Sequence, residues 1–304
     1  MVRIGIVDLD TPHAGSLTGL LRQHDDLAIS AVWDGRAVYP AGYAEQFAAE
    51  NGIEHVCESV EEMAGLVDLA LVLGVDWDFH LMRSEPFVEA GKMIYIDSPA
   101  AGKAAHCARL LEWEEKGARI MTGGAARFCK EIEETRRGIA DFGEIVSVFA
   151  SAPPDFFGRG IHIAEVIGAV LGPGVIGVKF IGSRDETSLF LIDYDGGPVC
   201  IMQLASPGHE ICLSICGHKK KAMVSVSGSD VSGLADAIAG FARTGRPPVP
   251  LKDALEAAGI MIAAGCACGR KDPVYIHKLD KCAGFDGWEY ADAYALAARS
   301  THAP

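Results

Sequence analysis

Histidine and carboxylate residues that can move or position protons stand in three short stretches of the sequence. These stretches are DLDTPH (8–13), DSP (97–99) and GIHIAE (160–165). A histidine such as His162 titrates near neutral pH and can therefore shuttle a proton at a reacting hydroxyl. Glu165 follows on the same predicted helix, where it either orients the imidazole ring or stays on the helix surface. These residue types favour an enzyme that transfers protons on its substrate.

The elements that must position these residues alternate regularly over the first 123 residues. Short, nearly continuous apolar runs predict buried strands, with helical patterns between them, at 2–9, 27–34, 67–75, 91–97 and 118–124. This order predicts α/β architecture with a Rossmann-like, doubly wound parallel sheet. Ligands of such sheets bind outside the carboxyl ends of the strands, at the stretches DLDTPH, WDGR, GVDWDFH and DSPAAG.

The pattern changes after Gly123. Two helical stretches are followed by closely spaced apolar runs with turn residues between them, which predict a large, open, mainly antiparallel sheet. Helical patterns return at 231–269, and the tail 278–304 can form a further helix of unassigned role. We therefore expect two domains, 1–123 and 124–304, the second being an α+β domain that carries substrate and oligomer contacts.

Charge and cysteine usage limit the function classes. The chain has 27 Lys and Arg against 41 Asp and Glu, a formal net charge of −14, which opposes binding to nucleic acid or to an anionic membrane. No apolar run reaches the ~20 residues that span a bilayer, and Met1 leads directly into a strand. Nine scattered cysteines predict buried thiols and a reducing compartment, so we expect a cytoplasmic protein without a cysteine metal site.

Three stretches carry a resemblance to a known family. VDLALVLGVDWDFHLMRSEPFVEAGKMIYIDSPAAGKAAHCARLL, GRGIHIAEVIGAVLGPG and FARTGRPPVPLKDALEAAGIMIAA together resemble the Gfo/Idh/MocA family of NAD(P)-dependent oxidoreductases, as far as about Leu279. The resemblance implies hydride transfer between NAD, or NADP, and a secondary hydroxyl or ketone of a sugar, polyol or sugar acid. It also implies a homodimer or homotetramer.

The resemblance implies a role for each matching residue. His162 is the expected proton-transferring group, and Asp97 and Ser98 stand where the family has Glu-Lys-Pro and position substrate or nicotinamide. The expected cofactor-binding residues are Asp10, Thr11, Pro12, His13, Asp34 and Arg36; Asp34 favours NAD and Arg36 weakens that preference. The expected substrate-binding residues are His80, Arg127, Arg159 and Glu165.

The sequence departs from the family at the phosphate loop. Asp8, Asp10 and His13 replace the three glycines of G-x-G-x-x-G, and Gly158 replaces the aspartate four residues before His162. The chain resembles a branch of the family with Asp-Thr-Ser-His and Gly-Ile-His-x-x-Glu at these places. Four interpretations of the loop stay open: an unusual NAD loop, an acid/base set with His162, a metal site, or a purely structural cap.

Three functions remain open on the sequence alone. The first is the NAD(P)-dependent oxidoreductase that the resemblance implies. The second is a non-redox isomerase, lyase or hydrolase on a sugar-like substrate, which uses His162 with Asp10 or His13. The third is a ligand-sensing protein that keeps the fold without turnover.

Overall fold

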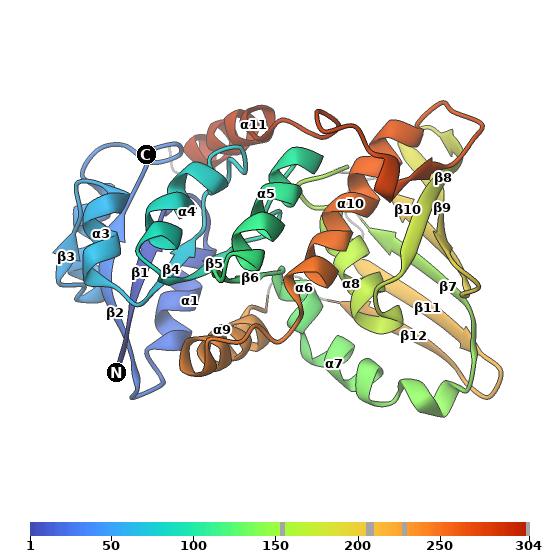
Figure 1. The fold of residues 1–304 in the computed structure, drawn as a ribbon, viewed down its shortest axis with the longest axis horizontal. Coiled ribbons are helices and arrows are strands. Elements are labelled where there is room, and N and C mark those ends of the chain that lie inside the picture. Colours follow the sequence, from blue (N-terminus) through green and yellow to red (C-terminus); the bar gives the residue numbers. More distant parts are fainter. Residues whose placement is uncertain (153–155, 205–209, 227–229, 302–304) are drawn as a thin grey trace.

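The computed structural model describes residues 1–152, 156–204, 210–226 and 230–301. Its two sheets lie at opposite ends of an elongated molecule, with helices packed around and between them (Figure 1). Among the described residues, no helix is both long and apolar enough to cross a membrane.

The first sheet is parallel throughout and has six strands in the order β3-β2-β1-β4-β5-β6. Its strands are β1 (Val2–Val7), β2 (Leu27–Trp33), β3 (His55–Val56), β4 (Leu69–Val72), β5 (Met93–Ile96) and β6 (Arg119–Thr122). The crossover helices are α1 (His13–Leu21), α2 (Tyr43–Asn51), α3 (Val60–Leu66), α4 (His80–Glu89) and α5 (Ala104–Glu115). Four of these strands are buried at nearly every position, which confirms the doubly wound sheet expected from their apolar runs.

The second sheet has seven strands in the order β12-β11-β7-β10-β9-β8-β13. Its strands are β7 (Ile145–Ala152), β8 (Val175–Arg184), β9 (Thr187–Tyr194), β10 (Val199–Leu204), β11 (Ile211–Gly217), β12 (Lys221–Val226) and β13 (Val274–Tyr275). All neighbours are antiparallel except the central pair β7 and β10. The expected large, mainly antiparallel sheet is therefore confirmed.

Helices of the second half pack on both sheets. The elements are α6 (Ala125–Phe128), α7 (Lys130–Arg137), the 3-10 helix η1 (Ile139–Phe142), α8 (Ile161–Leu171), α9 (Ser232–Thr244), α10 (Leu251–Ala267), the 3-10 helix η2 (Ile276–Lys278) and α11 (Gly287–Thr301). The buried faces of α8 and α10 pack with the second sheet, whereas α9 packs against α1 of the first sheet. The tail left unassigned by the sequence forms α11, which lies along the carboxyl ends of the first sheet (Figure 1).

Candidate active site

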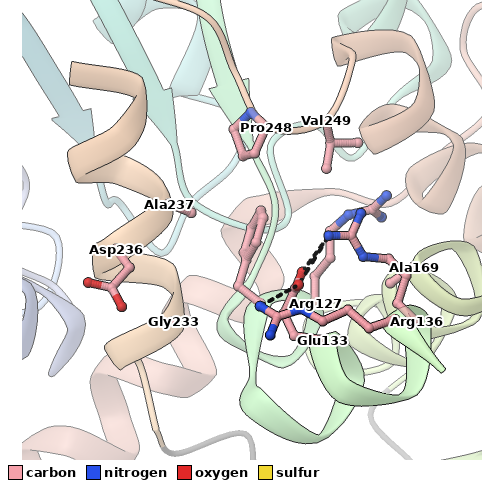
Figure 2. Close-up of a pocket in the computed structure, with 11 residues that line it drawn as sticks. Arg127, Glu133, Arg136, Ala169, Gly233, Asp236, Ala237, Pro248 and Val249 are labelled. Carbon is pink, nitrogen blue, oxygen red and sulfur yellow. Dashed lines mark hydrogen bonds and ion pairs between the residues drawn. The ribbon is translucent and has the colours of Figure 1, made fainter. Parts of the chain in front are cut away.

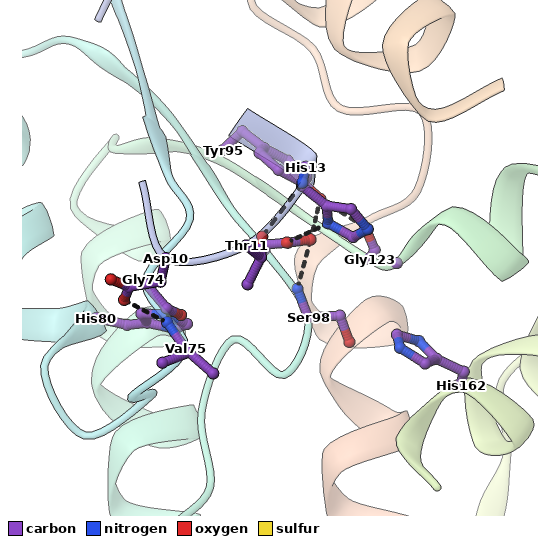
Figure 3. Close-up of polar contacts among 12 residues, drawn as sticks. Asp10, Thr11, His13, Gly74, Val75, His80, Tyr95, Ser98, Gly123 and His162 are labelled. Atoms are coloured by element: carbon purple, nitrogen blue, oxygen red, sulfur yellow. Dashed lines mark hydrogen bonds and ion pairs between the residues drawn. The ribbon is translucent and has the colours of Figure 1, made fainter. Parts of the chain in front are cut away.

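A histidine and an aspartate that are distant in sequence form the first polar pair. The Nδ1 atom of His13, at the start of α1, lies 2.6 Å from Oδ2 of Asp97, which directly follows β5. The other oxygen of Asp97 accepts hydrogen bonds from the Tyr95 hydroxyl at 2.8 Å and from the Ser98 backbone N–H at 3.0 Å. Figure 3 shows this network, which joins the start of α1 to the end of β5. Asp97 is therefore held in one orientation, with its charge directed at the imidazole ring.

A second histidine and carboxylate form an equivalent pair on α8. The Nδ1 atom of His162 lies 3.0 Å from Oε2 of Glu165, one helical turn further on. The other oxygen of Glu165 accepts a hydrogen bond from the Gly124 backbone N–H at 2.9 Å, directly after β6. This bond connects α8 to the carboxyl edge of the first sheet, and so it brings the second pair toward the first.

The two pairs face a common space beside Ser98. His162 and the Ser98 side chain point toward each other in Figure 3, and the charges of His13 and Asp97 both act on the pKa of His162. Both carboxylates are buried, while the His13 and His162 side chains keep 27% and 25% of their surface exposed. A molecule that enters this space therefore meets two imidazole rings, each supported from behind by a carboxylate.

The protonation of the pairs follows from these contacts. The charge of Asp97 raises the pKa of His13 more than burial lowers it. Burial lowers the pKa of His162, but the hydrogen bond and the charge of Glu165 together outweigh burial, so this pKa is also raised. Burial raises the carboxyl pKa values of Asp97 and Glu165, but the paired histidine and the neighbouring hydrogen-bond donors together outweigh it, so both pKa values are lowered. Both pairs therefore keep their charged forms over a wider pH range than the isolated groups would.

The position of Gly124 leads to a test of the second pair. An added Cβ at Gly124 would lie 2.6 Å from the Nδ1 and Cε1 atoms of the His162 ring, so Gly124→Ala forces the ring aside. Since a displacement of about 1 Å at a reacting group costs roughly 100-fold in rate, we expect kcat/KM to fall by about that factor. The His162 pKa, measured by NMR titration, should fall toward the free value. Gly65→Ala, where the added Cβ meets open space, is the matched control and should change neither quantity.

The loop DLDTPH directs its first aspartate inward. Asp8 has a left-handed backbone with φ of 69° and no exposed surface. Its carboxylate pairs with the buried guanidinium of Arg83 on α4 and accepts the Gly35 backbone N–H at 3.0 Å. Burial raises the pKa of Asp8 to about 7, against the opposing charge of Arg83. Asp8 thus ties the first loop to the loop after β2 and to α4.

The second aspartate of the loop fills the space between β1 and β4. Asp10 has no exposed surface, and its Oδ2 accepts the Val75 backbone N–H at 2.9 Å. Its Oδ1 is buried without a hydrogen-bond partner among the described residues. Burial raises the pKa of Asp10 to about 6. Because Asp8, Asp10 and His13 turn to three different partners, the metal interpretation of the loop finds no support in their geometry.

Two backbone N–H groups of this loop are already bound within the chain, and a third position has no N–H. The Leu9 backbone N–H donates to Oδ1 of Asp34 at 3.2 Å, and the His13 backbone N–H donates to the Thr11 hydroxyl at 3.3 Å. Pro12, which precedes α1, has no N–H to offer. Together with the buried carboxylate of Asp10, this arrangement does not fit a dinucleotide phosphate, whose binding needs free N–H groups at the helix N-terminus.

Four other predicted site residues lie outside the two histidine–carboxylate pairs. His80 is 1% exposed and its two ring nitrogens contact the Gly74 and Ala100 carbonyl oxygens, so its expected contact with substrate stays a prediction. Asp34 and Arg36 line a cavity of about 750 Å³ with Trp33 and Glu58, and Asp34 also accepts the Leu9 N–H of the loop. Arg159 is exposed just before α8, and its charge acts on Tyr294 of α11.

Arg127 lies behind the second pair rather than in front of it. Its side chain is 6% exposed, and Nη1 donates to the Glu165 carbonyl oxygen at 3.3 Å. It also lines a cavity of about 340 Å³ against α7 and α9, where Arg136 pairs with Glu133 (Figure 2). None of the four paired residues lines this cavity. Arg127 therefore contacts the backbone of α8, and its expected contact with substrate stays a prediction.

Three residues on which the site depends were not predicted from the sequence. Tyr95 and Gly124 hold the two carboxylates, and Arg83 neutralises part of the buried charge of the loop. Tyr95 and Gly124 lie near the carboxyl ends of the predicted strands 91–97 and 118–124, and Arg83 lies in the helical stretch between two predicted strands. These positions were the signal that the sequence offered. The contact of α11 with this region had no comparable signal, because its apolar residues are mostly alanines.

Comparisons with known proteins show the fold. Neither the family models nor the curated proteins contain a match to this chain. Among solved structures, a probable dehydrogenase from Thermotoga maritima matches with a TM-score of 0.80 at 18% identity, over 92% of this chain and all of that one. The scyllo-inositol dehydrogenase of Lactobacillus casei, solved with NAD(H) and scyllo-inositol, matches with a TM-score of 0.75 at 16% identity, over 91% of this chain and all of that one.

A third solved structure agrees with these two. The myo-inositol dehydrogenase of Lactobacillus casei, in complex with NAD(H) and myo-inositol, matches with a TM-score of 0.77 at 14% identity, over 95% of this chain and 99% of that one. Identities this low establish a common fold and leave the chemistry to the site itself. The chain thus has the fold of these dehydrogenases.

Proposed function

We propose that the protein is an enzyme that transfers protons on a sugar, polyol or sugar acid, as an isomerase, epimerase or lyase. The observation that supports this proposal is the pair of histidine–carboxylate contacts, His13 with Asp97 and His162 with Glu165, around Ser98. Each ring directs Nδ1 to its carboxylate. Its Nε2 is then an acceptor in the neutral form and a donor in the charged form.

Two such rings supply a base and an acid at the same time. In a dehydration, one neutral imidazole removes a proton from carbon while the other, protonated, gives its proton to the departing hydroxyl, which leaves as water. In an epimerisation, one ring removes the carbon-bound proton and the other returns a proton to the opposite face. His162 and His13 fill these two roles, and Asp97 and Glu165 stabilise whichever ring is charged.

The chemistry of the site favours a polyhydroxylated substrate. The Ser98 hydroxyl is buried and makes no hydrogen bond of normal geometry within the described residues, although it lies near enough to Glu165 to help lower the pKa of that carboxyl. A hydroxyl of this kind can exchange hydrogen bonds with a ligand hydroxyl, which is donor and acceptor alike. The inositol bound in structures of the same fold supports this substrate class.

A second candidate is the NAD(P)-dependent oxidoreductase acting on a secondary hydroxyl or ketone. It is favoured by Asp34, which follows β2 where an acid binds the adenosine ribose, and by the NAD(H) bound in structures of the same fold. In this candidate His162 exchanges the hydroxyl proton while the nicotinamide supplies hydride chemistry. The buried Asp10 and the engaged loop N–H groups support the first candidate instead.

We also propose that the protein forms a homodimer or homotetramer through its second sheet and works in the cytoplasm. The outer face of this sheet carries a row of paired positions, Met223, Ser214, Phe149 and Ile201, of which Met223 is 79% and Phe149 is 40% exposed. Covering such a row is a common reason for association. All nine cysteines are free, as is usual in a reducing compartment.

The experiment that tests the function uses solvent deuterium. Purified protein, shown by mass spectrometry to carry no nucleotide, is incubated in heavy water with a panel of hexoses, inositols and sugar acids. NMR should show deuterium at a carbon-bound position, or a dehydrated or epimerised product, without added nicotinamide. Turnover that requires NAD or NADP would establish the second candidate, and binding without any turnover would establish a sensor.

The pH dependence of this turnover has a defined shape. One ring must be neutral and the other protonated, so a plot of kcat/KM against pH should be bell-shaped. Its two apparent pKa values belong to the pair of histidines together. The carboxylates raise both histidine pKa values, so both apparent pKa values of the profile should lie above the value near 6.5 of a free imidazole. Replacing Asp97 by asparagine should shift one limb toward lower pH. A limb that stays in place would contradict the assignment.

A further inference from the structure

The C-terminal segment 285–301 is attached to the carboxyl edge of the first sheet by polar contacts. The Gly287 backbone N–H donates to Oδ2 of Asp78 at 2.8 Å, and the indole N–H of Trp77 donates to the Phe285 carbonyl oxygen at 3.0 Å. Lys103 pairs with Asp286 at 2.8 Å. The segment is therefore fastened to the loop after β4 and to the start of α5 at several points.

Apolar contacts continue this attachment along α11. Ala291 and Ala295 are 9% and 7% exposed, and they form one buried cluster with Val38 and Val75. Val38 follows β2 and Val75 follows β4, so α11 contacts loops on both sides of β1. The alanines let the helix approach closely, because they add little side-chain volume between it and the loops.

The region under α11 is the topological switch point of the sheet. The strand order reverses between β1 and β4, and dinucleotides bind in the crevice outside that point in doubly wound folds. Asp10 and Val75 face each other there. Burial raises the pKa of Tyr294, and the charges of Tyr39 and Asp10 raise it further, which places this α11 residue close to the same point.

The segment also reaches the helix that carries His162. An added Cβ at Gly158, just before α8, would lie 2.4 Å from the Tyr290 ring. The Tyr290 ring in turn lies 5.4 Å from the Trp77 ring, centre to centre. One turn of α11 thus packs between the loop after β4 and the entry to α8, the helix that carries His162.

We propose that the segment 285–301 is the permanent occupant of the dinucleotide crevice, and that the protein works with its own chain in the place where this fold otherwise holds a nicotinamide dinucleotide. The covering helix, the inward carboxylate of Asp10 and the engaged N–H groups of Leu9 and His13 act together. The His13 and His162 side chains keep 27% and 25% of their surface exposed, and a cavity of about 750 Å³ remains at Asp34 and Arg36, after β2. This inference does not rest on the acid/base proposal, which concerns the chemistry at the two histidines.

The test combines cofactor titration with amide hydrogen exchange on the full chain. We expect no calorimetric or fluorescence signal for NADH or NADPH, corresponding to a Kd weaker than about 1 mM. We also expect the amides around Ala291 to be protected as strongly as those of β4. Gly287→Ala places a Cβ 2.3 Å from Oδ1 of Asp76, so it should raise exchange in α11 by about tenfold or more. The control Gly65→Ala, with open space around its Cβ, should leave exchange unchanged.

Three results would overturn the inference. Micromolar NADH binding with unchanged protection of α11 would mean that the crevice is open. Micromolar binding together with faster exchange in α11 would make the helix a displaceable lid. Unprotected α11 amides in the free protein would mean that the segment is no stable occupant. The deuterium assay with sugars is read separately, so failure of the acid/base proposal leaves these readouts intact.

Discussion

Replacing His162 by glutamine is expected to lower kcat/KM of the deuterium-exchange reaction by roughly 100- to 10,000-fold. The glutamine keeps a polar side chain of similar length next to Glu165 and removes the imidazole, which can exchange a proton near neutral pH. General acid or base catalysis by one positioned group contributes about that much. The measurement is the initial rate of deuterium incorporation, with protein integrity followed by circular dichroism.

Two further variants separate a chemical role from a structural one. His13→Gln should cost a comparable factor, and the double variant should cost little more than either single one, because neither ring completes the reaction without the other. Glu165→Gln should cost less and should shift the pH profile, since Glu165 acts through the imidazole ring. Additive losses in the double variant would show that the two rings do not serve one reaction.

The sheet order and the strand ends were predictable for a simple physical reason. Buried parallel strands need apolar residues on both faces, so their sequences read as continuous apolar runs, and the residues after them meet at one edge. Asp97 and His13 follow this rule, because they lie at the ends of neighbouring parts of that edge and form a pair across 84 residues of chain. Sequence reasoning placed both residues there but assigned them to different roles.

The direction in which the side chains of the loop DLDTPH point could not be predicted from the sequence. Carboxylates at glycine positions predict repulsion of a phosphate only if they point outward, and burial of an aspartate depends on partners that the local sequence does not contain. Asp8 is buried because Arg83, 75 residues further on, reaches it. Asp10 is buried because the Val75 N–H and α11 close the space around it. Both facts depend on long-range packing.

Replacing Trp77 by alanine is expected to lower the free energy of unfolding by about 3–5 kcal/mol, the usual range for a buried aromatic residue. Trp77 is 2% exposed, packs with Phe157 and Tyr290, and donates to the Phe285 carbonyl oxygen. Its ring is therefore packed inside the protein rather than exposed for stacking on a sugar. Chemical denaturation of the full chain measures the loss.

The comparison with Trp288 makes this result specific. Trp288 lies one residue into α11 and is 54% exposed, so Trp288→Ala should change the unfolding free energy by less than about 0.5 kcal/mol. Trp77→Phe keeps a packed ring and removes the donor to Phe285, so it should cost about 1 kcal/mol and loosen α11 selectively in hydrogen exchange. If Trp77→Ala were as mild as Trp288→Ala, the loop after β4 would not anchor the C-terminal segment, and the crevice would lose its occupant.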